Sequence, residues 1–292
     1  MNMEEMNMAK WLVTGATGQL GALVVESLLK WVEAKDLAVS VRDPKKAEHL
    51  SKLGIDVRQG DFTEPESLRA AFAGIDRLLL ISSASGDRIA QHKAAVDAAK
   101  AAGVQFIAYT SVAKAQESGL FLAPDHRETE NAIRESGITY AILRNNWYLE
   151  NEASTIQAAL QGAPWLTSAG SGKVSWAARR DYAEAAAKVL ATEGHENVIY
   201  ELSGKPLTQE ELAALVQEAS GKDIQVQQVN DEAYTETLKG AGVPEGALPF
   251  LLLIQQGIRA GELDVESTDF ERVLGRPLTP LKVALGQIIN QG

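Results

Sequence analysis

The sequence predicts an α/β protein with a doubly wound parallel sheet and a smaller, mostly helical C-terminal substrate lobe. Short apolar runs alternate with amphipathic stretches over the first half of the chain, and a glycine-rich turn follows the first run. A glycine and a β-branched residue open several later runs. Consecutive apolar positions within a run are typical of strands covered by helices on both faces.

Six candidate strands follow one another between residues 11 and 144: WLVTG, LAVSVR, IDVRQ, IDRLLLI, VQFIAYT and ITYAILR. The last four each follow a glycine, at Gly54, Gly74, Gly103 and Gly137. Glycine just past a helix end takes a left-handed conformation without strain, so each of these joints predicts a helix end followed by a strand. ALVVESLLKWV reads as the first crossover helix, and Thr63 with Glu66 predicts a capping box for a later one.

After Arg144 the alternation loosens. We expect a helix near 181–192, a strand near 198–202, a helix near 209–219 and a strand at IQVQQV. Residues 231–291 read as helices separated by Gly and Pro. The interpretation is one domain over residues 9–150, with 177–202 returning to it, and a smaller substrate-binding lobe mainly over 151–292. Residues 1–8, which hold all four Met residues, are expected to be a disordered leader.

Composition excludes several classes of function. The 292 residues carry 28 Lys and Arg against 39 Asp and Glu, a net charge of −11, which disfavours nucleic acids and anionic membranes as partners. There is no Cys, and the four His residues lack metal-ligand spacing, so we expect neither thiolate chemistry nor a metal site. We expect a cytoplasmic protein, either a monomer or a homodimer.

The glycine-rich turn is the strongest functional motif. It directly follows the first candidate strand and precedes a helix, and its residues are Gly15, Ala16, Thr17, Gly18, Gln19, Leu20 and Gly21. Glycines here allow a tight turn, bring backbone N–H groups close to a pyrophosphate, and let the helix N-terminus face the negative phosphates. In this context, the motif predicts a Rossmann-like dinucleotide-binding site at residues 15–20.

The end of the second strand indicates which dinucleotide binds. NAD-binding folds tend to place a carboxylate there for the ribose 2′-hydroxyl, whereas this strand ends in Arg42. A guanidinium suits the 2′-phosphate of NADP. Asp43 follows one residue later, and a solvated basic turn is the alternative interpretation. We therefore favour NADP over NAD.

Other candidate site residues follow the remaining strands, because ligands of doubly wound sheets lie outside the carboxyl ends of the strands. They are Asp61 and Phe62, expected near the adenine; Ser82, Ser83 and Ala84, near the ribose; Asn145, Asn146, Trp147 and Tyr148, near the nicotinamide; and Thr110, expected in the cofactor site. Loop polarity would equally explain the Ser run, and core packing would explain Trp147 and Tyr148. His126 is interpreted as a surface residue at the start of a helix.

The absence of a YxxxK motif bears on the chemistry. No Tyr has a Lys four residues later, so the proton-transfer pair of the commonest short-chain dehydrogenases and of related sugar-nucleotide epimerases is missing. Reduction of an ordinary ketone needs a positioned acid for the developing alkoxide. A quinone spreads the incoming charge over a conjugated ring, and a cationic dye is neutralised by hydride. Such acceptors fit a site that contributes mainly positioning.

Longer blocks carry a family resemblance: GATGQLG, SVRDPKKA, LLLISS, QHKAAVDAAKAAGVQFIAYTS and DHRETENAIRESGITYAILRNNWYLEN. Together they resemble the NmrA-like group of atypical short-chain dehydrogenases, and within it the bacterial NADPH:quinone oxidoreductases. Triphenylmethane-dye reductases are nearly as similar, through AGSGK, VLATEGHENVIYEL and RPLTPLK. The likeness runs from about Trp11 to the C-terminus.

The resemblance implies NADPH bound without flavin or metal and hydride transfer to a quinone or a dye. It places residues 15–20 at the pyrophosphate, Arg42 at the 2′-phosphate, and the 83–85 loop and residues 145–150, Glu150 included, around the ribose, nicotinamide and substrate. Asn145 and Tyr148 are then the candidate catalytic residues, and Phe121, Asn146 and Trp147 line the substrate pocket. Relatives often carry Gly in place of Asn146, a departure that bears on substrate preference. A non-enzymatic NADP(H) sensor is the alternative function.

Overall fold

The computed structural model describes residues 10–83 and 86–290, so the predicted leader, residues 1–8, and Ala84 lie outside the described residues. The chain divides into two compact units. Unit 1 comprises Met1–Val112, Pro124–Arg144 and Tyr182–Tyr200, and unit 2 comprises Ala113–Ala123, Asn145–Asp181 and Glu201–Gly292. Unit 2 thus takes in residues 113–123 and 145–150, which the sequence analysis assigned to the first domain. The functional division of the chain stays a prediction.

The main sheet has seven strands in the order β3-β2-β1-β4-β5-β6-β9. They are β1 Trp11–Thr14, β2 Leu37–Val41, β3 Asp56–Gln59, β4 Arg77–Leu80, β5 Phe106–Val112, β6 Thr139–Asn145 and β9 Val198–Leu202. The first five pair in parallel, and β1 lies between β2 and β4, where the strand order reverses. Ligands of doubly wound sheets bind outside such a switch point. All six strands predicted before residue 145 are confirmed, as is β9.

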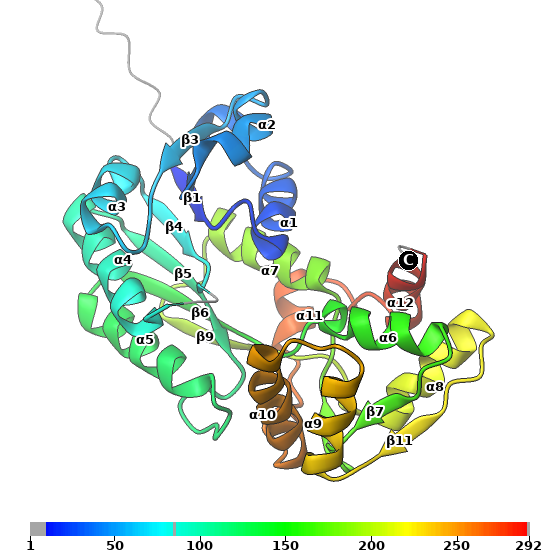
Figure 1. Ribbon diagram of the computed structural model, residues 1–292. Helices are drawn as coiled ribbons and strands as arrows, with labels where there is room; N and C mark the ends of the chain where they lie inside the picture. The colour runs from blue at the N-terminus through cyan, green and yellow to red at the C-terminus, as the bar shows by residue number, and fades with distance from the viewer. Residues whose placement is uncertain (1–9, 84–85, 291–292) are drawn as a thin grey trace, which may run out of the picture. The chain divides into compact units, whose positions relative to one another are not determined.

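Helices cover both faces of this sheet (Figure 1). One face carries α3 Pro65–Phe72, α4 Arg88–Ala102 and α5 Ala123–Ser136, and the other carries α1 Gln19–Leu28 and α7 Arg179–Ala191. The first face forms a core in which Phe72 and Ala99 pack against Leu78 and Ile107. The connections also contain η1 Ala34–Asp36, η2 Pro44–Ala47 and α2 Glu48–Ser51. The predicted doubly wound α/β class is confirmed.

The glycine joints are confirmed, whereas the first capping prediction is wrong. Gly54, Gly74, Gly103 and Gly137 have φ angles of 86°, 73°, 78° and 77°, in the left-handed region. The N-cap of α3 is Glu64 and makes no side-chain hydrogen bond. The hydroxyl of Thr63 instead donates to Asp61 Oδ1 at 2.8 Å, because the chain is still turning out of β3 at that point.

Unit 2 is mostly helical with two small sheets. Its helices are η3 Leu149–Glu152, α6 Ala153–Leu160, α8 Gln209–Ser220, α9 Asp231–Gly240, η4 Glu245–Ala247, α10 Leu248–Arg259, α11 Asp269–Leu274 and α12 Leu281–Ile289. Strand β7 Trp165–Thr167 pairs in parallel with β11 Val226–Gln228, and β8 Lys173–Val174 pairs antiparallel with β10 Leu207–Thr208. In the described ranges, no helix is long and apolar enough to cross a membrane.

Two sets of hydrogen bonds stabilise the ends of segments in unit 2, and neither was predicted from the sequence. Thr208 and Glu211 form a reciprocal capping box that starts α8. Asp181 is fully buried and accepts hydrogen bonds from Arg276 Nη2 at 2.7 Å and from both the backbone N–H and the hydroxyl of Thr279. The hydrogen bonds to Asp181 hold the RPLTP segment against the start of α7.

Candidate active site

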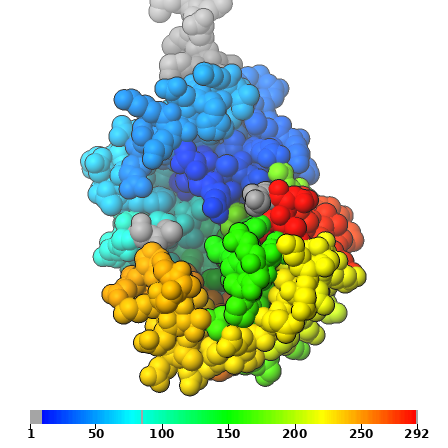
Figure 2. Space-filling model, turned by 45° about the vertical axis from the view of Figure 1, so that its right-hand side comes forward, coloured from blue at the N-terminus to red at the C-terminus, as the bar shows by residue number. Residues whose placement is uncertain are grey.

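A cavity of about 440 Å³ lies at the carboxyl ends of β1, β2, β3 and β4, within unit 1. Ten predicted cofactor-binding residues line it: Gly15, Thr17, Gly18, Gln19, Leu20, Arg42, Asp61, Phe62, Ser82 and Ser83. In Figure 2 the earliest described residues, drawn in dark blue, reach the surface on the face shown, below the lighter blue segments that follow them in the chain. Ala16 and Thr110 are buried, at 1% and 2% exposure, and are not part of the wall.

The glycine loop has the geometry of an anion-binding turn. Gly15 has a φ of 65°, and a Cβ on Gly21 would lie 2.2 Å from the carbonyl oxygen of Gly15, so the helix packs this closely only with glycine there. The N-cap of α1 is Gly18, which has no side chain to cap the helix, and the first turn carries no acidic residue. The helix N-terminus is therefore free to take a negative group, which fits a pyrophosphate.

The end of β2 presents one cation to the cavity. Arg42 lines the cavity, whereas Asp43 accepts a hydrogen bond from the backbone N–H of Lys45 at 3.1 Å and so starts η2. Hydrogen bonds from Thr63 to Asp61 lower the pKa of Asp61, with a smaller contribution from the Arg42 charge. Because Asp43 is used as a helix cap, Arg42 is the side chain available for a ribose substituent at this strand end.

Side chains behind the cavity wall hold the loop after β4. The backbone N–H of Ser82 donates to Thr110 Oγ1 at 2.9 Å, and that of Ser83 donates to His92 Nε2 at 3.0 Å. His92 Nε2 must then be the unprotonated ring nitrogen, which leaves Nδ1–H to donate to Thr129 Oγ1 at 2.9 Å. Ser82 and Ser83 are therefore held by hydrogen bonds to buried side chains, and both line the cavity.

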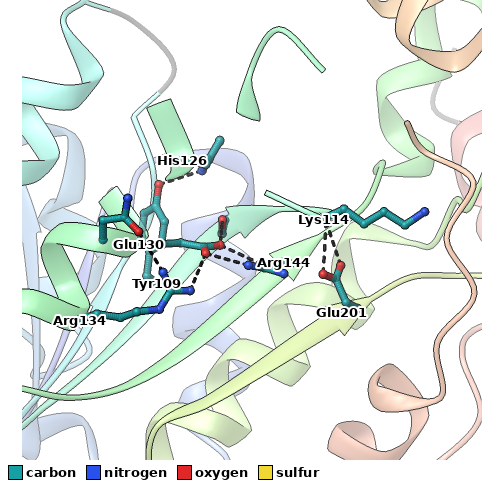
Figure 3. A network of polar contacts seen from close by, with 9 residues as sticks. Tyr109, Lys114, His126, Glu130, Arg134, Arg144 and Glu201 are labelled. Atoms are coloured by element: carbon teal, nitrogen blue, oxygen red, sulfur yellow. Dashed lines mark hydrogen bonds and ion pairs between the residues drawn. The ribbon is translucent and has the colours of Figure 1, made fainter. Parts of the chain in front are cut away.

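The surface interpretation of His126 is wrong. His126 is only 7% exposed, and its Nδ1 shares a hydrogen bond of 2.8 Å with the hydroxyl of Tyr109 (Figure 3). Burial, reinforced by the charges of Arg88 and His92, lowers the pKa of His126 to about 3. Sequence alone placed His126 at a helix start but gave no sign that Tyr109 on β5 would cover it.

A buried carboxylate lies in the same network. Glu130 is fully buried and bonds to Arg144 at 2.9 Å, to Arg134 at 3.0 Å and to the hydroxyl of Ser111 at 2.7 Å. Figure 3 shows the guanidinium groups of Arg134 and Arg144 converging on Glu130. It also shows Lys114 of unit 2, whose backbone N–H donates to both carboxylate oxygens of Glu201. Two cations satisfy Glu130, so we assign it a structural role.

Asn145, the last residue of β6, and the residues directly after it belong to unit 2. Asn145 Nδ2 donates to the hydroxyl of Tyr148 at 3.0 Å, and Asn145 Oδ1 is buried with no hydrogen-bond partner within the described residues. Burial raises the pKa of Tyr148, partly offset by the hydrogen bond from Asn145. The guanidinium of Arg179 lies 5.3 Å from the centre of the Tyr148 ring. The structure thus pairs the two predicted catalytic side chains.

Neighbouring predicted residues have structural partners. Asn146 is 5% exposed; its Nδ2 donates to Ser203 and to the Leu263 carbonyl, both at 3.2 Å, and its Oδ1 accepts from the Trp147 N–H. Glu150 accepts the backbone N–H of Arg179 through both oxygens, at the start of α7. Asn146 and Glu150 thus hydrogen-bond within unit 2, and their contact with a ligand stays a prediction.

A second cavity, of about 270 Å³, lies within unit 2. We call it the aromatic cavity; its lining residues are Trp147, Asn151, Glu152, Thr155, Trp165, Leu166, Gln209, Tyr234, Phe250, Leu251, Ile254 and Gln255. Phe121, a predicted substrate residue, packs edge-to-face on Phe250 with the ring centres 5.3 Å apart and is not itself among the lining residues. Sequence reasoning missed Glu152 and Tyr234, because nothing in their local pattern separates them from surface helix residues.

The fold and the glycine-loop cavity define a Rossmann-like α/β protein. A model of the NmrA-like family matches residues 8–256, and the chain belongs to that family. The chain is 42% identical over 280 residues to quinone oxidoreductase 2 of Escherichia coli K12, covering 95% of this chain and 98% of that protein. The predicted family and fold class are confirmed.

Two crystal structures are similar along nearly the whole chain. Triphenylmethane reductase of Citrobacter sp., complexed with NADP(H), gives a TM-score of 0.92 at 42% identity and covers 96% of this chain and 99% of that one. NADPH-dependent quinone oxidoreductase from Escherichia coli, complexed with NADPH, gives a TM-score of 0.92 at 42% identity, with 96% and 100% covered.

Proposed function

We propose that this protein is an NADPH-dependent reductase that transfers hydride directly to a quinone or a similar electron-poor conjugated acceptor, without flavin or metal. The observation that carries the proposal is the glycine-loop cavity with Arg42 at the end of β2 and Asp43 turned into a helix cap. The similarity to a quinone oxidoreductase over nearly the whole chain supports it. Bound NADPH supplies the hydride.

In this proposal the residues of unit 1 hold the cofactor. Backbone N–H groups of the glycine loop and the N-terminus of α1 bind the pyrophosphate. The guanidinium of Arg42 binds the 2′-phosphate through charge-assisted hydrogen bonds. Thr110 and His92 keep Ser82 and Ser83 in the cavity wall through the backbone hydrogen bonds described above.

Asn145 and Tyr148 are the proposed catalytic residues. The raised pKa of Tyr148 keeps the phenol protonated at neutral pH, and because its oxygen accepts from Asn145 Nδ2, its own proton is directed elsewhere. A neutral phenol is a suitable hydrogen-bond donor to the oxygen of a reduced quinone. The unpartnered Oδ1 of Asn145 is a suitable acceptor for an amide N–H, such as that of a carboxamide.

The domain assignment follows as part of the proposal. Residues 9–150 with 177–202 serve the cofactor, and residues 151–292 mainly serve the acceptor, with Trp147 and the wall around it as the apolar surface. Asn146, Glu150 and Phe121 then shape the substrate region. The absence of Cys and the acidic composition fit the cytoplasm as the place of action.

Reduction of a cationic triphenylmethane dye is the second candidate function. The similarity to triphenylmethane reductase is as high as that to the quinone oxidoreductase, at 42% identity. A cationic dye becomes neutral on accepting hydride, so it needs no proton donor. The two functions therefore make different demands on Tyr148.

The test is steady-state oxidation of NADPH and NADH with benzoquinone, menadione and malachite green, using the wild type, Arg42→Ala and the control Lys46→Ala. We expect saturable oxidation of NADPH. Loss of a charge-assisted hydrogen bond in Arg42→Ala should raise the KM for NADPH about tenfold or more and leave that for NADH within about twofold. Lys46 is exposed and lies outside the cavity wall, so its variant should behave as wild type.

Two outcomes would contradict the proposal. If Arg42→Ala changed the KM for NADPH and the KM for NADH equally, Arg42 would not bind the 2′-phosphate. Tight NADPH binding with no turnover on any acceptor would favour the non-enzymatic sensor.

A further inference from the structure

The aromatic cavity contains a single carboxyl group of unusual environment. Glu152 lines the cavity at the end of η3, and the indole N–H groups of Trp147 and Trp176 both donate to its Oε1, each at 3.2 Å. No donor in the described residues bonds to Oε2. The carboxyl group is therefore held in place through one oxygen, and the other oxygen remains able to accept from a ligand.

Among the described residues, no Lys, Arg or His forms an ion pair with this carboxylate. None of the residues that line the aromatic cavity is Lys, Arg or His, and Glu152 is the only acid among these described residues. Burial raises the pKa of Glu152, opposed by the hydrogen bonds from the two indoles. Burial, with a smaller contribution from the charge of Glu152, raises the pKa of Tyr234 to about 12. Burial disfavours the charged form of such a carboxyl group, so a ligand that carries positive charge is the partner that most favours its ionised form.

The other walls suit the same kind of ligand. Trp147, Trp165, Tyr234 and Phe250 present aromatic rings, and Leu166, Leu251 and Ile254 complete an apolar surface. Aromatic faces attract cations, and cages of such rings bind quaternary ammonium groups. These walls come from segments drawn in green, yellow and orange, which adjoin on the face shown in Figure 2.

The size of the cavity limits what enters it. At about 270 Å³ it is slightly below the usual range for ligand pockets, roughly 300–1,000 Å³, so it takes one substituted ring rather than a whole multi-ring molecule. We propose that the aromatic cavity is a subsite for an aromatic cation, a single ring bearing a cationic nitrogen, and that Glu152 is the residue that selects the cation over a neutral ring of the same shape. Where that ring is part of the electron acceptor, this inference rests on the proposed reductase function.

The direct test uses a cation that NADPH cannot reduce. Binding of benzyltrimethylammonium is measured by isothermal titration calorimetry to the wild type, Glu152→Gln and Glu232→Gln, with benzyl alcohol as the neutral ring. The amide of Glu152→Gln keeps an acceptor for both indoles but loses the charge. Glu232, exposed on α9 and outside the wall, is the matched charge control. Thermal melting verifies that each variant folds.

We expect the wild type and Glu232→Gln to bind the cation equally, and Glu152→Gln to bind it about tenfold more weakly. Benzyl alcohol should bind all three proteins within about twofold of one another. Equal affinity of wild type and Glu152→Gln for the cation would overturn the inference, as would a wild type that does not bind the cation at all. If Glu152→Gln melts far below the wild type, Glu152→Asp provides the second comparison: it keeps the charge and should retain more of the affinity than Glu152→Gln.

A kinetic experiment separates this inference from the proposed function. In Glu152→Gln, kcat/KM for malachite green, whose single positive charge is shared by its dialkylaminophenyl rings, should fall about tenfold, with that for menadione within about twofold. An equal fall for both acceptors would overturn the role in selection. Absence of turnover in the wild type would refute the reductase, whereas the calorimetric difference between wild type and Glu152→Gln would still establish the subsite.

Discussion

The buried His126 predicts a specific loss of stability in acid. Its imidazole is hydrogen-bonded to the hydroxyl of Tyr109, and burial, with the charges of Arg88 and His92, lowers its pKa from 6.5 to about 3. In the unfolded chain His126 takes up a proton near its ordinary pKa of 6.5, whereas in the folded chain it takes up a proton only at much lower pH. The contribution of His126 to stability is therefore complete above about pH 6.5 and is lost as the pH falls through 6.5 towards 3.

The size of the effect follows from the two pKa values. With 6.5 for the unfolded chain and about 3 for the folded one, proton linkage lowers the free energy of unfolding by about 2 kcal/mol between pH 7 and pH 5. That is a large share of the roughly 5–15 kcal/mol that holds a typical protein folded. His92, whose pKa is lowered to about 4 mainly by burial, adds a loss in the same direction.

The assay is urea unfolding at pH 7 and pH 5, followed by tryptophan fluorescence, for the wild type, His126→Gln and His49→Gln. The amide of His126→Gln can still form a hydrogen bond with the Tyr109 hydroxyl, as donor or acceptor, but does not titrate. We expect the wild type and His49→Gln, which lacks only an exposed histidine, to lose about 2 kcal/mol more than His126→Gln. Losses equal within about 0.5 kcal/mol in all three proteins would refute the reasoning.

Three further predictions concern other parts of the chain. Gly21→Ala should lower stability by about 1–3 kcal/mol and weaken NADPH binding, because the new Cβ meets the Gly15 carbonyl oxygen; unchanged thermal melting and titration would count against this close approach. Asp181→Ala should cost about 2–3 kcal/mol in urea unfolding, since Arg276 and Thr279 lose their common acceptor, and an unchanged midpoint would disprove that role. Tyr148→Phe should reduce kcat with menadione about tenfold or more and spare malachite green, and an equal effect on both acceptors would exclude Tyr148 as the proton donor.

Much of unit 1 was predictable because its determinants are local. Consecutive apolar residues indicate buried parallel strands, and glycine past a helix end indicates a joint, so all the strands up to β6 could be placed. The glycine loop could be assigned for the same reason, since its strand, turn and helix are adjacent in the sequence. The capping box at Thr63 failed because α3 begins one residue later than expected, with Glu64 as its N-cap, while the Thr63 hydroxyl donates to Asp61.

The sequence by itself determined the α/β class, the glycine loop, the cation at the end of β2 and the family, all of which depend on residue types at short, fixed spacings. Only the tertiary structure decided which polar groups are buried and what they meet. Tyr109 and His126 are paired across a strand and a helix, and Asp181 meets Arg276 from 95 positions further along the chain. Glu152 came to lie in an aromatic wall by the same long-range packing. Burial and partner distance set the pKa of each such group, and both are properties of contacts between segments that no local pattern records.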